Sequence, residues 1–207
     1  MPKADNPRRL AILGAAFHVL MERGYAGAST LEIARRAKVS KRELYAEFGS
    51  KSGILEALIA STSARMQVPL GNADFTDRAG FVAVLSAYGT AALGELTGPH
   101  VVAVNRLAAA EATRSPELGK LLDKRGREAN RRALIALMEK AQAAGVLSAG
   151  DPAVPAGQFF YLLTSDLLLR LVLGTAKAPT AAEIRHRVDS AVDAVLRLNA
   201  PPTKVTR

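Results

Sequence analysis

Hydroxyl and cationic side chains gather between residues 30 and 51, and they suit hydrogen bonding to a polyanion better than bond breaking. The candidates for such contacts are Thr30, Ser40, Lys41, Arg42, Tyr45 and Lys51. A lysine or arginine can donate to O6 and N7 of guanine, while hydroxyls and amines can hold phosphate oxygens. We therefore expect Lys41 or Arg42 to contact bases, and Thr30, Tyr45 and Lys51 to contact phosphates.

Two short helices joined by a tight turn would position these side chains. Ser29 stands three residues ahead of Glu32, which is the spacing of a capping box at a helix start. Ser40 stands three residues ahead of Glu43 in the same way. Apolar residues follow each start at helical spacing: Leu31, Ile33, Ala34 and Ala37 in the first helix, Leu44 and Phe48 in the second. Residues 38–40 then fit the turn of a helix-turn-helix, with Val39 filling the angle between the helices.

This stretch resembles the DNA-binding domain of the TetR family of transcriptional repressors over about the first 55 residues. The resemblance is carried by Gly24-Tyr25, Ser29-Thr30, Ile33-Ala34, Leu44-Tyr45, Phe48 and Ser50-Lys51. The chain departs from the family at Lys38, where glycine is usual. We expect Lys38 to adopt the left-handed backbone at some cost, or the turn to differ slightly. A second departure, at Ala46-Glu47, bears on which bases are read.

The resemblance implies two domains. We expect a three-helix DNA-binding domain at 1–51, a helical regulatory and dimerisation domain at 52–207, and a linking helix at about 51–66. Lys51 would begin the linking helix, where the helix N-terminus already favours an anion such as phosphate. The segment EATRSPELGKLL and the later AAGVL turn resemble the regulatory domains of the same family. That resemblance implies a ligand cavity and a homodimer made by the last two helices, about 152–174 and 180–199.

Helical spacing continues along the chain and predicts an all-α protein of about nine helices. The first helix would begin at Asn6-Pro7 and bury a stripe of Leu10, Leu13, Phe17 and Leu20. Later starts are predicted at Asp74 or Thr76, His100, Ser115-Pro116, Asp151-Pro152 and Thr180. Residues 201–207 are expected to be a frayed tail.

Composition narrows the class of protein further. The chain has no cysteine, which excludes disulfides, thiolate catalysis and cysteine-based zinc sites. Its net charge is +9 and its pI about 10.2, and residues 1–51 hold ten lysines and arginines against five acids. This balance favours a polyanionic partner, although alone it would also suit a membrane surface. The N-terminus lacks an apolar signal core, and the run 159–174 looks too short to span a bilayer, so we expect a cytoplasmic protein.

No constellation for catalysis or metal binding is visible in the sequence. The three histidines, His18, His100 and His186, lie on separate predicted helices without a partner at metal-binding spacing. There is no activated serine and no glycine-rich phosphate loop, so we expect no enzyme activity, metal or cofactor.

Candidate pocket residues in the second domain are Leu85, Tyr88, Asn105 and Phe159, although a residue of this kind is more often plain core than a ligand contact. Asn105, among valines and alanines, suggests a hydrogen-bonding group that points inward. We expect a dimeric repressor that binds a palindromic operator and is released by a small, mostly apolar effector. Two alternatives stay open: a DNA-binding protein without an effector, which a solidly filled second core would favour, and a helical small-molecule carrier.

Overall fold

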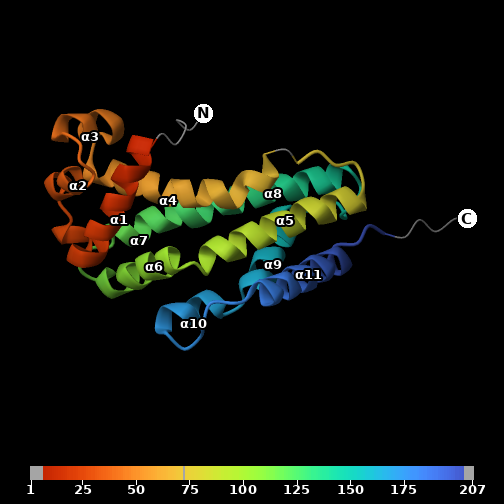
Figure 1. Cartoon of the computed structure of the whole chain (residues 1–207). Helices are drawn as coiled ribbons and strands as arrows, with labels where there is room; N and C mark the ends of the chain where they lie inside the picture. Colours follow the sequence, from red (N-terminus) through yellow and green to blue (C-terminus); the bar gives the residue numbers. More distant parts are fainter. Residues whose placement is uncertain (1–6, 72, 203–207) are drawn as a thin grey trace, which may run out of the picture. The chain divides into compact units, whose positions relative to one another are not determined.

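The computed structural model describes residues 7–71 and 73–202 of the 207-residue chain, and every regular element within them is helical (Figure 1). The elements are α1 (Pro7–Gly27), α2 (Thr30–Arg36), α3 (Lys41–Phe48), α4 (Lys51–Gln67), the 3-10 turn Val68–Leu70, α5 (Arg78–Leu96), α6 (Pro99–Glu111), α7 (Glu117–Leu121), the π-helical segment Leu122–Arg127, α8 (Glu128–Ala143), α9 (Ala153–Thr164), α10 (Leu167–Leu173) and α11 (Ala181–Leu198). The predicted all-α class is confirmed. The predicted cap at Asn6 and the tail residues 203–207 lie outside the described residues.

Two helical segments more than the expected nine arise from interruptions of two predicted helices, and only the first interruption holds a glycine, Gly126, that could break a helix. The π-helical segment Leu122–Arg127 separates α7 from α8. Ser165, with φ 46° and ψ −131°, separates α9 from α10. The predicted single helix at about 152–174 is therefore wrong, because a backbone of that shape cannot continue a helix.

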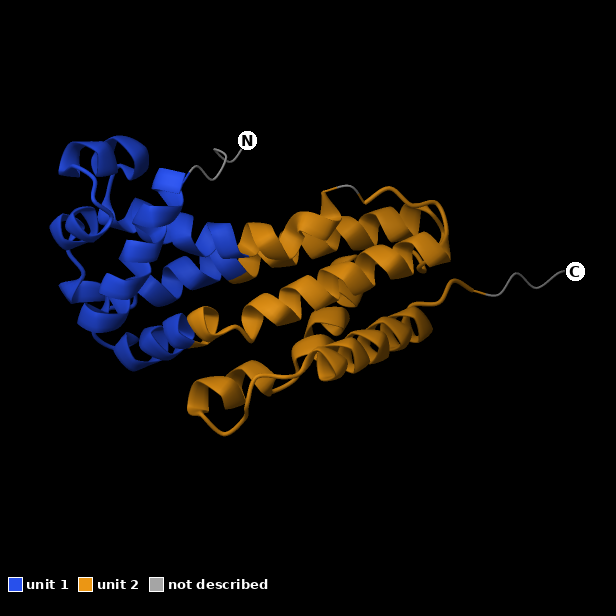
Figure 2. Cartoon of the chain, in the orientation of Figure 1, with its two compact units in different colours: residues 1–62, 103–126 blue, residues 63–102, 127–207 orange. Residues whose placement is uncertain are grey.

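The chain forms two compact units, and each combines stretches that are distant in sequence. The first unit holds residues 1–62 and 103–126, and the second holds 63–102 and 127–207 (Figure 2). The division falls within α4 and α6 rather than in a loop. The expected domain boundary at residue 51 concerns which segment binds DNA. Compactness does not test that point, so the boundary stays a prediction.

The helix-turn-helix part of the first unit is built on one apolar cluster. Its buried members are Ile12, Leu13, Ala15, Ala16, Val19, Ala28, Ile33, Ala34, Leu44 and Ile54. Val39 and Phe48 pack against this cluster, as expected. Leu10 and Leu31, however, are 50% and 66% exposed, so their predicted core positions are wrong. The buried stripe of α1 instead runs through residues 12, 13, 16, 19 and 20, which turns Leu10 toward solvent.

A second cluster in the first unit packs α1 and α4 against α6 and α7. Its buried members are Leu20, Leu55, Ile59, Val104, Ala108, Leu118 and Leu121. The segment 103–126 therefore shares a core with the N-terminal helices. Fully burying a large apolar side chain stabilises the fold by about 1.5–3 kcal/mol. Burial of these residues therefore holds α6 and α7 in this unit.

The second unit is organised around α5, α8, α9 and α11. Helix α11 packs against α9 and α5, and α8 packs against α9. Phe81, Leu85 and Tyr88 of α5 are fully buried in this core. A Cβ added at Gly89 would stand 3.0 Å from Cζ of Phe159, so a side chain at this position would crowd the close approach of α5 to α9.

Two segments of the second unit are long and apolar enough to cross a membrane by length and composition. One is α5, and the other is the pair α9 and α10 taken together, which bends by 43°. The run 159–174 was expected to be too short for a membrane span. With the start of α9 at Ala153 included, the pair of helices is long and apolar enough for one. The buried residues of α5 pack in the core of the unit, and a core helix has the same composition as a span.

Candidate nucleic-acid interface

The turn between α2 and α3 is a helix C-cap with lysine in the position that favours glycine. The amide of Val39 donates to the carbonyl of Ala34 at 3.0 Å, and the amide of Lys38 donates to that of Arg35 at 3.2 Å. These two bonds form the Schellman pattern, whose C′ residue must be left-handed. Lys38 has φ 55°, so of the two alternatives for this residue the left-handed one is confirmed.

The two predicted helix caps differ in the structure. Ser40 forms the full capping box with Glu43, since its hydroxyl accepts from the Glu43 amide at 3.1 Å and its own amide donates to Glu43 Oε2 at 2.8 Å. Ser29 accepts from the amide of Glu32, but the Glu32 carboxylate accepts from Arg35 and Arg36 instead of reaching back. Those hydrogen bonds, from Arg35 first and then Arg36, lower the pKa of Glu32 to about 2.

The outer face of α3 presents cations that have no acidic partner in the described part of the chain. Lys41 and Arg42 are exposed, and Tyr45 is 40% exposed. The ammonium of Lys41 lies 5.7 Å from the centre of the Tyr45 ring. Arg42 makes no hydrogen bond or ion pair with any other residue in the described ranges. Its five N–H donors are therefore available to an outside acceptor.

Thr30 and Tyr45, both expected to hold phosphates, lie together although they belong to different helices. The Thr30 hydroxyl and the Tyr45 hydroxyl are hydrogen bonded at 3.1 Å. One hydroxyl donates in this pair, so the other keeps its own proton for a further acceptor. The pair can thus still donate one hydrogen bond to a phosphate oxygen.

The two arginines of α1 neutralise the acids of α3. Arg8 pairs with Glu43, and Arg9 pairs with Glu47 at 2.8 Å. The guanidinium of Arg9 also lies 4.8 Å from the centre of the Phe48 ring. The pKa of Glu43 is lowered, chiefly because its carboxylate accepts from the backbone amide of Ser40. The acids of α3 are consequently held by partners within the unit, and α3 meets solvent with net positive charge.

Lys51 begins α4, as expected, but its ammonium already has intramolecular contacts. It donates to the backbone carbonyl of Tyr25 at 2.8 Å and lies 4.7 Å from the centre of the Tyr25 ring. An ammonium has three donors. A phosphate contact by Lys51 would therefore add to, rather than replace, its bond to Tyr25.

Three of the four predicted pocket residues share one buried cluster of the second unit. Leu85, Tyr88 and Phe159 are fully buried there, with the Tyr88 and Phe159 rings 6.3 Å apart. Asn105 is half-buried in the first unit and is not a member of this cluster. The Tyr88 hydroxyl is buried without a hydrogen-bond partner among the described residues. Burial raises the pKa of Tyr88 to about 12.

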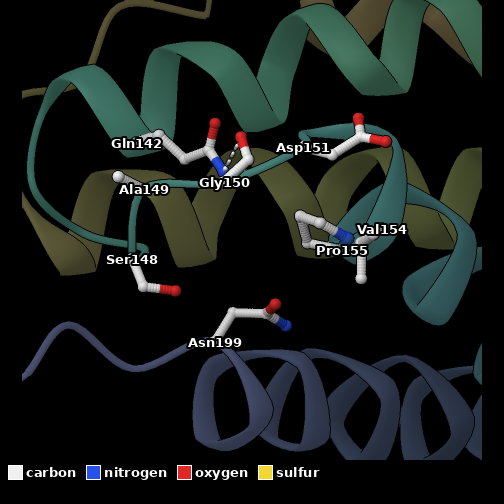
Figure 3. A pocket seen from close by; sticks show the side chains of 8 residues that line it. All are labelled: Gln142, Ser148, Ala149, Gly150, Asp151, Val154, Pro155 and Asn199. Atoms are coloured by element: carbon white, nitrogen blue, oxygen red, sulfur yellow. Dashed lines mark hydrogen bonds between the residues drawn. The ribbon is translucent and has the colours of Figure 1, made fainter.

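A hollow of about 230 Å³ that the sequence did not suggest opens at the surface of the second unit (Figure 3). It is lined by Gln142, Ser148, Ala149, Gly150, Asp151, Val154, Pro155 and Asn199. Its polar groups are largely engaged: Gln142 donates to the Gly150 carbonyl at 3.3 Å, and Asp151 accepts from the Ala153 amide at 2.9 Å. In the sequence, Gly150 and the Asp151-Pro152 helix start indicate a turn at this site and not a hollow. No group of three or more metal-ligating side chains occurs within 7–71 and 73–202.

Comparison with known families places this arrangement among helix-turn-helix transcription regulators. Residues 12–58 match the family of bacterial regulatory proteins, tetR family. Residues 83–200 match the AefR-like transcriptional repressor, C-terminal domain. The chain belongs to the TetR family, which is a family of transcription regulators and not of enzymes.

Solved structures agree with this assignment along nearly the whole chain. The Flavonoid-responsive Regulator FrrA is 31% identical, with a TM-score of 0.73, over 95% of this chain and 98% of that chain. A TetR transcriptional regulator from Agrobacterium tumefaciens is 32% identical, with a TM-score of 0.74, over 94% of this chain and 95% of that chain.

The curated relatives match less than a third of this chain. The uncharacterized HTH-type transcriptional regulator YvkB of Bacillus subtilis (strain 168) is 38% identical over 58 residues, which are 28% of this chain and 31% of that protein. YdeS of the same organism is 35% identical over 66 residues, or 31% of this chain and 33% of that protein. The match therefore spans about a third of either relative.

Proposed function

We propose that this TetR-family regulator is a cytoplasmic homodimeric repressor that binds a palindromic DNA operator through α3 and is released by a small effector. The observation that carries the proposal is the outer face of α3. Lys41, Arg42 and Tyr45 are exposed there, while both acids of the helix are paired with arginines of α1. A helix with such a face fits the major groove, and two copies would read half-sites about 34–36 Å apart.

Selection of bound duplexes from a random pool, at about 0.15 M salt, tests the DNA-binding part of the proposal. A palindromic consensus is expected. Arg42→Ala should weaken binding to that consensus about tenfold or more, because a bidentate base contact is worth about 1–3 kcal/mol. Arg132→Ala, which removes an exposed arginine of α8, is the matched control and should bind normally. Equal binding by both variants would refute the role of Arg42, and retention of every sequence alike would refute a sequence-specific repressor.

Exposed apolar side chains on α9 and α10 support the proposed dimer. Tyr161 is 73%, Leu162 46%, Leu169 60% and Leu173 66% exposed in the isolated chain. Apolar side chains gathered in this way on adjacent helices suit a protein interface better than solvent. A second copy of the chain is the proposed cover, with α11 completing the interface.

The unpartnered hydroxyl of Tyr88 supports a site for the effector. A buried hydroxyl without a partner is unfavourable by about 1–3 kcal/mol, and a ligand that hydrogen bonds to it would recover part of that energy. Leu85 and Phe159 make the surroundings apolar and aromatic. We propose a neutral ligand with apolar rings and a hydrogen-bonding oxygen; FrrA is named as flavonoid-responsive, and a flavonoid has this chemistry. Naringenin should raise the melting temperature of the wild type and release the selected duplex, and Tyr88→Phe should weaken both effects.

One observation favours a second candidate, a repressor that needs no effector. The core beside Tyr88 is closely packed, since Phe159 lies 3.0 Å from the Cβ position of Gly89, and the hollow in Figure 3 is lined by other residues. A ligand would therefore have to displace core side chains. A broad screen of apolar ligands that leaves both melting temperature and DNA binding unchanged would establish this second candidate.

A further inference from the structure

The last residue of α6, Glu111, holds the end of α1. At Gly24 the φ of 70° and ψ of 178° interrupt α1, which takes the amide of Tyr25 out of the regular helical pattern. The Glu111 carboxylate accepts this amide with both oxygens, at 3.2 Å from Oε1 and 3.0 Å from Oε2. A side chain of α6 thereby fixes the backbone of the chain immediately before α2.

Gly24 is required for this contact for two reasons. A Cβ on residue 24 would stand 2.2 Å from Oε1 of Glu111, closer than any real contact. The positive φ of Gly24 also favours glycine over any residue with a side chain. The Gly24-Tyr25 pair, noted in the sequence as part of a family resemblance, therefore serves as the docking point of the Glu111 carboxylate.

Tyr25 also contacts the first residue of α4. Its carbonyl and its ring both receive the ammonium of Lys51, the first residue of α4. Burial, and then the charge of Glu117 at the start of α7, raise the pKa of Tyr25. Tyr25 thus contacts α6 through its amide and α4 through its carbonyl and ring, and all of these contacts lie inside the first unit.

We propose that Glu111 is the positioning residue that fixes the DNA-binding helices to α6, through Tyr25 and Lys51, and thereby sets the spacing of half-sites that the protein accepts. The inference rests on the proposed function, because it gives Glu111 a role only in a protein that binds an operator. The other buried residues of α6 in this unit, Val104 and Ala108, make apolar contacts, which are non-directional and tolerate sliding. The hydrogen bonds between the Tyr25 amide and the Glu111 carboxylate are directional, so they do not tolerate sliding of α6.

The spacing between half-sites provides the test, since a head that is loosened from α6 should accept operators of more than one spacing. We would measure dissociation constants for the selected palindrome and for the same palindrome with two base pairs added at its centre. The ratio of these constants is the spacing preference. Glu111→Ala should lower the preference about fivefold or more, which is the lower end of typical coupling between sites. Glu111→Gln, which keeps an oxygen acceptor, should retain most of it.

Hydrogen exchange of the Tyr25 amide and a second variant distinguish loss of the Glu111 contact from general destabilisation of the unit. The Tyr25 amide should exchange slowly in the wild type and in Glu111→Gln, and fast in Glu111→Ala. Gly24→Ala displaces the carboxylate without removing it and should lower the spacing preference in the same way, so it carries the test if Glu111→Ala does not fold. In the double variant the two effects should not add, because both act on one contact.

The outcomes separate this inference from the proposed function. A wild type that selects no palindrome overturns both. A wild type with a spacing preference that survives unchanged in Glu111→Ala overturns the inference alone. An equal loss of affinity at both spacings also overturns it, because that result is what simple destabilisation would give.

Discussion

Replacing Lys38 by glycine tests the left-handed turn between α2 and α3 on a single residue. Lys38 has φ 55° and is exposed, so the substitution changes the backbone energy and one surface charge but no core contact. Lys38→Ala removes the same charge and keeps a Cβ. The difference in stability between the two variants therefore isolates the effect of the Cβ in the left-handed conformation.

The magnitude follows from two opposing terms. A residue other than glycine in the left-handed helical conformation costs roughly 1–2 kcal/mol. Glycine loses about 0.4–1 kcal/mol more than alanine on folding, because its unfolded chain is more flexible. Lys38→Gly should thus be more stable than Lys38→Ala by about 0.5–1 kcal/mol. For a chain of this length, such a difference raises the melting temperature by about 1–4 °C.

Thermal unfolding followed by circular dichroism, with urea unfolding as a second measure, checks this prediction. Both variants should lose the same small amount of DNA affinity, since both lack the lysine charge. A Lys38→Ala variant as stable as Lys38→Gly, or more stable, would refute the argument. It would mean that the turn is not left-handed in solution or that neighbouring contacts relax to accommodate the Cβ.

Three further predictions concern other parts of the chain. Tyr88→Phe should raise the free energy of unfolding by about 1 kcal/mol in urea, because it removes a buried hydroxyl without a partner; a loss of stability would mean that the hydroxyl is satisfied. Glu32→Gln should lower the melting temperature at pH 7. The folded-state pKa of this acid lies at about 2, below its ordinary 4.5, so its contribution is complete above pH 4.5 and lost toward pH 2. The gap to wild type should close over that range, and an unchanged gap at pH 2.5 would contradict the ion pair. Tyr161→Glu on α9 should convert the dimer to monomer in sedimentation experiments, whereas Val68→Glu, at a similarly exposed apolar position, should not; a monomeric wild type would rule out the proposed dimer.

The features of the helix-turn-helix that were predictable are those encoded within a few consecutive residues. The capping box needs only Ser40 and Glu43 at the right spacing, and it forms as expected. The left-handed turn needs only one residue in the place of a glycine, and Lys38 adopts it. Such local patterns identify a helix start or stop without knowledge of the surrounding fold.

Contacts between distant residues were not predictable in this way. From the sequence alone, Arg8 and Arg9 are equally compatible with phosphate contacts and with a solvated end, and only the structure shows their ion pairs with Glu43 and Glu47. Glu111 meets Tyr25 across 86 positions of sequence, and nothing near either residue indicates the other. The break at Ser165 was missed for a different reason. Residues 164–166 contain no glycine or proline, and Leu163 and Leu167 keep helical spacing across them, although three polar residues in a row can also indicate a loop.

The ion pairs between α1 and α3 have a consequence for the thermodynamics of DNA association. The ions released on binding are the cations condensed on the DNA, and an arginine already paired with a carboxylate neutralises little of the phosphate charge that holds them. On α3 and in the turn before it, the cations without an acidic partner among the described residues are Lys38, Lys41 and Arg42. If each neutralised one phosphate, a dimer would neutralise about six, and the slope of log K against log salt would be about −5. Raising the salt from about 50 to 200 mM would then weaken the complex roughly a thousandfold, which makes operator occupancy a sensitive function of ionic strength.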